Sequence, residues 1–342
     1  MVATAREPQA VAVALQAALS RHGGEAGSVQ ELKRLTGGAT KTTWAFDWVS
    51  GGGAQALILQ QMPAAAGPKG RAPKLGARED AAVMRAARAG GAPAPVVRLV
   101  LGEADGLGEG YVTEAVAGET LGKKLVQDTA FADARQHMAR QCGQILATIH
   151  RLPLEGLSFL QTLSPADELS VYAELLDACG VRHPALAYAL RWVQEHLPTD
   201  WTPALVHADF RTGNLIVGPE GVRCVLDWEI ARIGDPMQDL GVLCMRSWRF
   251  GGAGEVGGFG AREDLYAAYE ATSGRSVDRE RVRFWEAFSN LKWAIACARR
   301  GSARRDDGRP ASLELSAVGR RLEEPLWDFF QLLAGTPAGG AA

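Results

Sequence analysis

Near Gly118 the sequence changes character, and this change limits what the chain can fold into. Before it, short segments rich in β-branched and aromatic residues alternate with glycine turns, as at 41–46 and 56–59. After it, long segments carry apolar residues at helical spacing, most clearly over 131–150. The pattern predicts an α+β fold with a small β-rich N-lobe at 1–117 and a larger α-rich C-lobe at 118–342.

The same patterns give the expected elements of each lobe. We expect strands at 41–46, 56–59, 96–101 and 111–116, and helices at 9–20, 78–89, 131–150, 165–178, 184–197, 262–272, 278–300 and 311–334.

Composition excludes several classes of protein. The 342 residues are 47% hydrophobic and carry a net charge of −2, which argues against a nucleic-acid binder that relies on many phosphate contacts. The five cysteines are scattered and odd in number, which favours free thiols in a reducing compartment. Arg6 to Gln9 interrupt the Ala-rich N-terminal segment, so we expect no signal peptide there. No apolar run is long enough to span a membrane. We expect a cytoplasmic protein with no nucleic-acid or membrane partner, and nothing here indicates its oligomeric state.

One polar motif, within residues 205–240, points to phosphoryl transfer. His207, Asp209 and Asn214 follow the spacing H-x-D-x-x-x-x-N, and Asp227 ends an apolar strand-like segment thirteen residues later. Transfer of a γ-phosphoryl group needs a carboxylate to orient and deprotonate the attacking hydroxyl, and oxygen ligands to hold Mg²⁺. Each residue alone is also typical of a surface turn; the combination favours a catalytic loop.

This stretch resembles the aminoglycoside phosphotransferase/choline kinase-like family, small-molecule kinases with a two-lobed protein-kinase-like fold. It matches their H-x-D-x-x-x-x-N loop and their D-W-E-x-A-x-x-G-D-P-x-x-D-L segment, and the similarity extends over nearly the whole chain. The pieces at 248–250 and 257–260 are similar to the branch associated with acyl-CoA dehydrogenases. The resemblance implies a kinase that uses ATP and Mg²⁺ to phosphorylate a small-molecule hydroxyl acceptor.

The resemblance also implies roles for the motif residues. Asp209 would be the catalytic base, and Asn214 and Asp227 would be the Mg²⁺ ligands. Arg211 would neutralise phosphate or contact substrate. His207 would support the loop by hydrogen bonding rather than take part in chemistry.

Three acidic residues that follow in this segment favour structural roles. Asp235 precedes Pro236 and can cap the next helix. Asp239 can accept hydrogen bonds from the backbone of the catalytic loop. For Glu229 we likewise favour a structural role.

In the N-lobe the resemblance places the nucleotide. Gly37, Gly38 and Thr40 match a phosphate-binding loop, although a plain hairpin would look the same. Glu114 and Val116 fall at the hinge whose backbone would hydrogen-bond the adenine.

The chain departs from the family pattern at the phosphate-binding cation. Gln60 stands where a lysine or arginine is expected, so Glu79, placed like the family's glutamate partner, lacks its cation. Alternatively, Glu79 is a solvent-exposed residue that has no partner role, because the helix dipole favours glutamate in the first turn of any helix. Lys41 or the basic loop at 62–77 could replace the missing charge; that loop carries Lys69, Arg71 and Lys74. Otherwise nucleotide affinity would be weak, or the enzyme would use another phosphoryl donor.

The acceptor is less constrained by sequence. The resemblance implies that the helical region after the D-W-E segment builds the acceptor pocket. There, residues 245–310 contain thirteen Lys and Arg against nine Asp and Glu, and this excess favours a neutral or anionic acceptor such as a hydroxyacyl-CoA. A polycationic aminoglycoside would need carboxylates. An antibiotic phosphotransferase and a nucleotide-binding pseudokinase stay open as alternatives.

Overall fold

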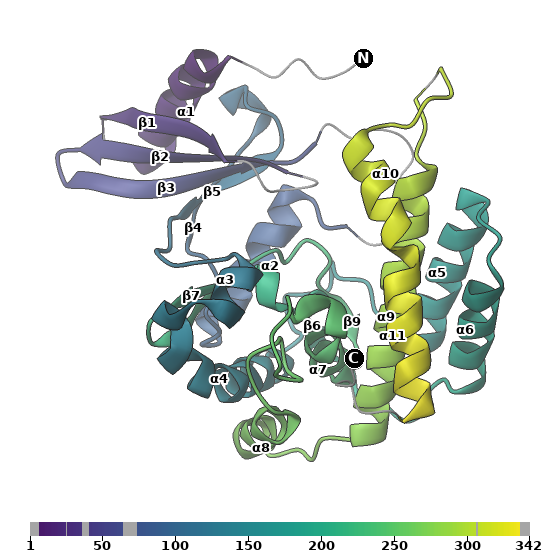
Figure 1. The fold of residues 1–342 in the computed structure, drawn as a ribbon. Helices are drawn as coiled ribbons and strands as arrows, with labels where there is room; N and C mark the ends of the chain where they lie inside the picture. Colours follow the sequence, from purple (N-terminus) through teal and green to yellow (C-terminus); the bar gives the residue numbers. More distant parts are fainter. Residues whose placement is uncertain (1–6, 25, 36–40, 64–73, 306, 336–342) are drawn as a thin grey trace. The chain divides into compact units, whose positions relative to one another are not determined.

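The computed structural model of the chain describes residues 7–24, 26–35, 41–63, 74–305 and 307–335 (Figure 1). Gly37, Gly38, Thr40, Lys69 and Arg71 lie outside these residues. The chain divides into two compact units. Unit 1 consists of residues 1–118 and 224–231, and unit 2 consists of residues 119–223 and 232–342.

Unit 1 is built on a five-stranded antiparallel sheet with the strand order β1-β2-β3-β5-β4 (Figure 1). Its elements are α1 (Pro8–Gly23), β1 (Gly27–Leu35), β2 (Thr42–Ser50), β3 (Gly53–Gln61), α2 (Ala77–Ala89), β4 (Val97–Val100), the 3₁₀ turn η1 (Glu103–Asp105) and β5 (Gly110–Glu114). The strands expected at 41–46 and 56–59 are present and extend further, because the turn at Gly51–Gly53 pairs β2 with β3 over their full lengths.

The two faces of this sheet have different roles, as the two-residue period of a strand requires. Trp44, Leu59 and Val112 point to one face and are buried with Val11 and Leu15 of α1, forming the apolar core of the unit. Residues of opposite parity, including Gln60 and its cross-strand partner Tyr111, lie on the other face. The polar groups of the unit gather on that second face.

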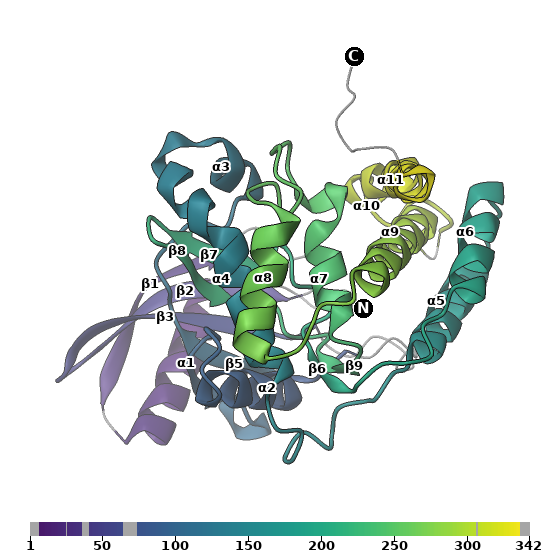
Figure 2. The same cartoon turned by 90° about the horizontal axis from the view of Figure 1, so that it is seen from below.

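Unit 2 is mainly helical, and its helices are seen best in Figure 2. Its elements are α3 (Gly122–Gln127), η2 (Thr129–Phe131), α4 (Ala132–His150), α5 (Pro165–Cys179), α6 (Pro184–Glu195), β6 (Ala204–Val206), η3 (Thr212–Asn214), β7 (Leu215–Gly218), β9 (Arg232–Gly234), α7 (Met237–Cys244), η4 (Arg246–Trp248), α8 (Arg262–Ser273), α9 (Arg279–Ser302), α10 (Leu313–Gly319), η5 (Arg320–Leu322) and α11 (Glu323–Ala334). Within β8 (Gly221–Val225) the chain passes from unit 2 to unit 1. Phe284 and Phe288 of α9 are buried in the core of this unit.

The helical segment expected at 311–334 is divided, which corrects the sequence prediction. α10 ends at Gly319, and a 3₁₀ turn separates it from α11. Gly319 lies so close to Gly301 of α9 that a Cβ on either residue would overlap the other backbone. This close crossing of α10 and α9 is a tertiary contact, and helical periodicity carries no signal for it.

Two further expectations can be compared with the structure. All five cysteines are free thiols, as their scattered spacing predicted. Across the described residues, no helix combines the length and apolar character needed to span a membrane.

Gly143 of α4 provides a test of the helix packing in unit 2. A Cβ at this position would overlap the carbonyl oxygen of Leu265 in α8. We expect Gly143→Ala to lower the free energy of unfolding by about 1–3 kcal/mol, the usual effect of overpacking a close contact. The measurement is urea unfolding followed by circular dichroism.

Gly23 supplies the matched control. It ends α1, and a Cβ there meets no atom within 4 Å. Gly23→Ala should leave stability unchanged or raise it by up to about 1 kcal/mol, because alanine favours helix. Equal stability of Gly143→Ala and the wild type would contradict close packing of α4 on α8.

Candidate functional site

A buried lysine is the centre of the polar cluster of unit 1. Lys41 directly precedes β2, on the same sheet face as Gln60, and its side chain is 5% exposed. Its Nζ lies 3.0 Å from Asp80 Oδ2, 3.3 Å from Asp227 Oδ1 and 3.4 Å from Glu229 Oε2. One cation therefore joins carboxylates from α2 and from the segment 224–231.

The charge of Lys41 is fixed by these neighbours. Burial alone would lower the pKa of its ammonium group, because the charged form is poorly solvated there. The carboxylates of Asp80, Asp227 and Glu229 more than offset this effect and raise the pKa above its usual value. Lys41 is therefore a permanent cation.

The carboxylate partner of this cation is Asp80 rather than the Glu79 expected from the sequence. Asp80 is fully buried, whereas Glu79 is half-buried, because successive residues of a helix point about 100° apart. Tyr111 completes the contact: its hydroxyl donates 2.8 Å to Asp80 Oδ2 and lies 2.6 Å from Gln60 Oε1. The uncharged side chain of Gln60 is thus linked to the Lys41–Asp80 ion pair through the hydroxyl of Tyr111.

Residues 224–231 are anchored to unit 1 by backbone hydrogen bonds. The N–H of Val225 donates to Pro93 O at 2.7 Å, and the N–H of Leu75 donates to Glu229 O at 2.8 Å. Asp227 has a φ of +64°, a left-handed conformation that costs energy for a residue other than glycine and is frequent at functional sites. Its side chain is 38% exposed. Asp227 is therefore held in a strained but accessible position.

Glu229 belongs to the same cluster, although the sequence favoured a structural role for it. Its Oε1 lies 2.7 Å from Lys74 Nζ, so Glu229 contacts two lysines. The cluster then contains three carboxylates and two ammonium groups, and this negative balance suits an additional cation.

The predicted hinge lies at the end of β5. The N–H of Glu114 donates to Val96 O, and the N–H of Ala115 donates to Ala56 O. Val116 makes no backbone hydrogen bond to another residue in the described part of the chain. Its N–H and C=O are groups to which a planar heterocycle could bind.

In unit 2, Asp209 is surrounded by donors from its own loop. Arg211 Nε lies 3.1 and 3.2 Å from the two carboxylate oxygens of Asp209, and Asn214 Nδ2 donates 2.7 Å to Oδ2. The N–H of Asp209 donates to Nδ1 of the buried His207, at 3.2 Å. The structure thus brings together the four loop residues that the sequence singled out, and His207 makes the supporting hydrogen bond expected of it.

The loop that carries Asp209 is anchored by Asp239 of α7. Its carboxylate accepts from the N–H groups of His207 at 2.8 Å and Ala208 at 2.7 Å, and it lies 3.0 Å from His150 Nε2. Burial would raise the pKa of Asp239, but the hydrogen bonds and charges of His150 and His207 hold it below its usual value. These contacts confirm the predicted role of Asp239, and they fix Ala208 at a φ of +68°. Asp235 accepts from the N–H of Met237 at 3.0 Å, as expected of a cap.

An aromatic stack beside Asp209 was not predicted from the sequence. The guanidinium of Arg211 lies 4.5 Å from the ring centre of Trp248, and Trp248 lies 5.2 Å from Trp293 of α9. The guanidinium of Arg300 lies 5.2 Å from the ring centre of Trp293. Trp293 Nε1 and Arg300 Nη1 are buried donors that have no hydrogen-bond partner among the residues that the structure describes. Trp248 and Trp293 are 45 positions apart in the sequence, so motif analysis does not detect this contact.

Comparison with known families identifies what these features resemble. Residues 31–285 match the model of the phosphotransferase enzyme family. The match includes Lys41, Asp80, Asp209, Asn214 and Asp227.

Curated relatives are acyl-CoA dehydrogenase family members. Member 10 of Mus musculus is 31% identical over 118 residues, which are 32% of this chain and 11% of that protein. Member 11 of Gallus gallus is 27% identical over 236 residues, which are 62% of this chain and 30% of that protein. The chain thus spans less than a third of the length of these relatives.

Solved structures share the fold at low identity. A protein from Ralstonia eutropha, described as a candidate aminoglycoside phosphotransferase, superposes with a TM-score of 0.73 at 22% identity, covering 94% of this chain and 98% of its own. A spectinomycin phosphotransferase bound to ADP and spectinomycin has a TM-score of 0.62 at 12% identity, covering 93% and 97%. The predicted protein-kinase-like α+β fold is therefore confirmed.

Asp239 offers a test of how the Asp209 loop is held. We expect Asp239→Ala to lower the free energy of unfolding by about 3–5 kcal/mol, because it leaves buried donors of His207, Ala208 and His150 without an acceptor. Chemical denaturation at neutral pH measures the loss. Asp264→Ala, which removes an exposed carboxylate 3.9 Å from Arg140, is the matched control and should cost about 1 kcal/mol or less.

The effect of pH follows from the sign of the shift. The pKa of Asp239 is lower in the folded protein than in the unfolded chain, so its contribution is present above about pH 4 and is lost as the pH falls further. The difference between wild type and Asp239→Ala should therefore shrink in acid. A difference that stays constant down to about pH 2 would contradict an ionised Asp239 as the anchor.

Proposed function

The chain belongs to the phosphotransferase enzyme family, and we propose that this small-molecule kinase transfers the γ-phosphoryl group of ATP, with Mg²⁺, to the hydroxyl of a hydroxyacyl-CoA or a related metabolite. The observation that carries the proposal is the cluster around Lys41 in unit 1, where a permanently charged lysine is held by a helix carboxylate beside Asp227. Unit 2 adds a carboxylate, Asp209, suited to activate a hydroxyl.

Lys41 supplies the phosphate-binding cation that Gln60 cannot. It approaches from the start of β2 rather than from β3, but it lies on the same face and contacts the same Asp80–Tyr111 pair as Gln60. A buried ammonium group oriented by a carboxylate binds phosphate oxygens as a point charge. The pseudokinase alternative rested on Gln60, and Lys41 removes that support.

The residues present fit Mg²⁺. Asp227 and Glu229 provide carboxylate oxygens in a cluster with an excess of negative charge. In unit 2, Asn214 uses its Nδ2 on Asp209, so its Oδ1 is the atom suited to a metal ion. No group of three His, Cys, Asp or Glu side chains in the described ranges forms a complete metal site. Mg²⁺ commonly binds through one or two protein oxygens, substrate phosphates and water, and it would neutralise charge on the transferred group.

Asp209 is the group we assign to the acceptor hydroxyl. Arg211 and Asn214 hold its carboxylate in place, and both donate to the charged form. A hydroxyl that approaches Asp209 can transfer its proton to a carboxylate oxygen as the phosphoryl group is transferred. Arg211 is placed to balance the charge of the phosphate.

The stack of Arg211, Trp248, Trp293 and Arg300 supports an acceptor that is neutral or anionic. Aromatic faces suit an apolar or planar group, and guanidinium groups suit phosphates and carboxylates. The excess of Lys and Arg over 245–310 supports this less than the sequence implied, because many are engaged. Arg249 and Arg262 lie near Glu286, and Lys292 pairs with Glu168. The names of the curated relatives, acyl-CoA dehydrogenase family members, favour an acyl-CoA.

The second candidate is antibiotic phosphorylation, which the fold shared with the spectinomycin phosphotransferase favours. One screen separates the two. Purified protein with ATP and Mg²⁺ is given hydroxyacyl-CoAs, kanamycin-type amino sugars or macrolides, and ADP release is measured. We expect turnover with a hydroxyacyl-CoA; turnover with an antibiotic alone would establish the second candidate.

The catalytic role of Asp209 is tested by Asp209→Asn, which keeps the size of the side chain and one acceptor oxygen but removes the base. We expect the rate of phosphoryl transfer to fall about 10²–10⁴-fold while ATP affinity is retained. The readout is kcat with the acceptor found in the screen, or ATP hydrolysis if none is found. A rate within about threefold of wild type would remove Asp209 from this role.

The nucleotide role of Lys41 is tested by Lys41→Ala. Charge-assisted hydrogen bonds contribute about 1.5–3 kcal/mol each, so we expect ATP affinity to fall roughly ten- to hundredfold. Calorimetric titration with Mg²⁺-ATP measures it, after thermal unfolding has shown that the variant is folded. Lys33→Ala, which removes an exposed lysine of β1, is the control and should bind as wild type. Equal affinity of the two variants would show that Lys41 does not hold phosphate.

A further inference from the structure

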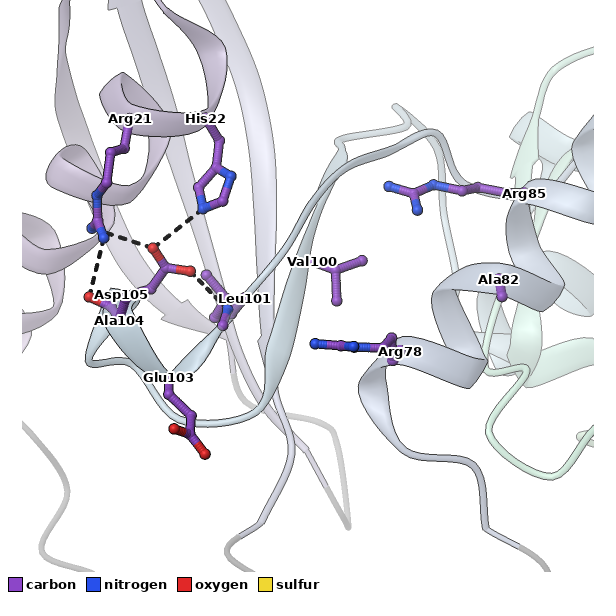
Figure 3. Close-up of a pocket in the computed structure, with 11 residues that line it drawn as sticks. Arg21, His22, Arg78, Ala82, Arg85, Val100, Leu101, Glu103, Ala104 and Asp105 are labelled. Atoms are coloured by element: carbon purple, nitrogen blue, oxygen red, sulfur yellow. Dashed lines mark hydrogen bonds and ion pairs between the residues drawn. The ribbon is translucent and has the colours of Figure 1, made fainter. Parts of the chain in front are cut away.

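Unit 1 contains a cavity that the proposed function does not use. It has a volume of about 600 Å³ and lies between the end of α1, one side of α2 and the turn after β4 (Figure 3). Its size is within the range of small-molecule pockets. Ala82, Val100 and Leu101 give it an apolar floor.

Cations from two elements face this cavity. Arg21 and His22 come from the last turn of α1, and Arg78 and Arg85 come from α2. Figure 3 shows Arg78 and Arg85 extending from α2 toward the side that Arg21 and His22 line. Positions 78, 82 and 85 share one face of the helix, as the 3.6-residue period requires.

The α1 side of the cavity is preorganised. Asp105 is buried, and its Oδ1 lies 3.2 Å from Arg21 Nη2 and 3.4 Å from His22 Nε2. Arg21 also donates to Ala104 O at 3.1 Å, and Asp105 Oδ2 accepts from the N–H of Gly102 at 2.7 Å. The side chains of Arg21 and His22 are thus already fixed at the rim.

The α2 side carries two arginines whose charge no carboxylate in the described part of the chain balances. Arg78 and Arg85 form no ion pair or hydrogen bond with any residue that the structure describes. The other carboxylate at the cavity, Glu103, is exposed and belongs to η1. Among the described residues, the cavity is thus lined by three arginines, one buried carboxylate that is already paired, and one exposed carboxylate.

We propose that this cavity binds a small molecule that carries a pyrophosphate or two phosphate groups beside an apolar group. Guanidinium groups bind phosphate oxygens in a bidentate manner, and two of them on one helix face match two adjacent phosphates. Val100 and Leu101 contact the apolar group. The site is separate from the Lys41 cluster, because Asp80 lies on the buried side of α2 while Arg78 and Arg85 are exposed.

Inorganic pyrophosphate is the probe for this site, in buffer free of divalent cations. Methyl NMR of Val100 and Leu101 reports on the cavity floor, and we expect saturable shifts on titration. In Arg78→Gln/Arg85→Gln the affinity should fall at least about tenfold. Lys33→Gln/Arg34→Gln, which removes the same charge from exposed positions of β1, should behave as wild type.

Lys41→Ala separates this site from the nucleotide site. The shifts of Val100 and Leu101 should persist in that variant, whether or not Lys41 binds ATP. Loss of these shifts in Lys41→Ala would place pyrophosphate at the Lys41 cluster and overturn the proposal. So would an absence of saturable shifts in the wild type, or unchanged affinity in Arg78→Gln/Arg85→Gln with an intact reference spectrum.

Discussion

The buried ion pair between Lys41 and Asp80 is the contact on which the candidate nucleotide site depends. It joins the start of β2 to α2, and Tyr111 extends it to β5 and to Gln60 of β3. Breaking a buried pair of this kind typically costs about 3–5 kcal/mol, a large share of the stability of a domain. The Lys41–Asp80 ion pair therefore both orients the lysine and stabilises unit 1.

The Asp209 loop of unit 2 follows the same physical rule. A buried carboxylate, Asp239, accepts two backbone N–H groups and fixes Ala208 in a left-handed conformation that it would not otherwise adopt. Asp227 in unit 1 is also left-handed. In both units a strained backbone position occurs at a candidate functional group, and hydrogen bonds from rigid elements hold the surrounding segment.

The sequence predicted most of the elements but not β1, and it grouped His207, Asp209, Arg211 and Asn214 in one loop, because strand alternation, helical spacing and a short motif are local signals. It left Lys41 as one of several possible cations, since the choice depends on which lysine or arginine lies beside α2 in the folded chain. It selected Glu79 instead of Asp80, because a shift of one residue turns a helix position from half-buried to buried. The contact of Trp248 with Trp293, and the close approach of Gly319 to Gly301, arise only from tertiary packing.

The central claim is that Lys41 supplies the phosphate-binding positive charge that the family pattern has at position 60. The most direct measurement is the Mg²⁺-ATP affinity of the transposed variant Lys41→Gln/Gln60→Lys, by calorimetric titration beside Lys41→Gln alone. Residue 60 already contacts Tyr111, so a lysine there can reach Asp80. The account predicts that Lys41→Gln loses affinity about tenfold or more and that the transposed variant recovers to within about threefold of wild type. Wild-type affinity in Lys41→Gln, or no recovery in a folded transposed variant, would contradict it.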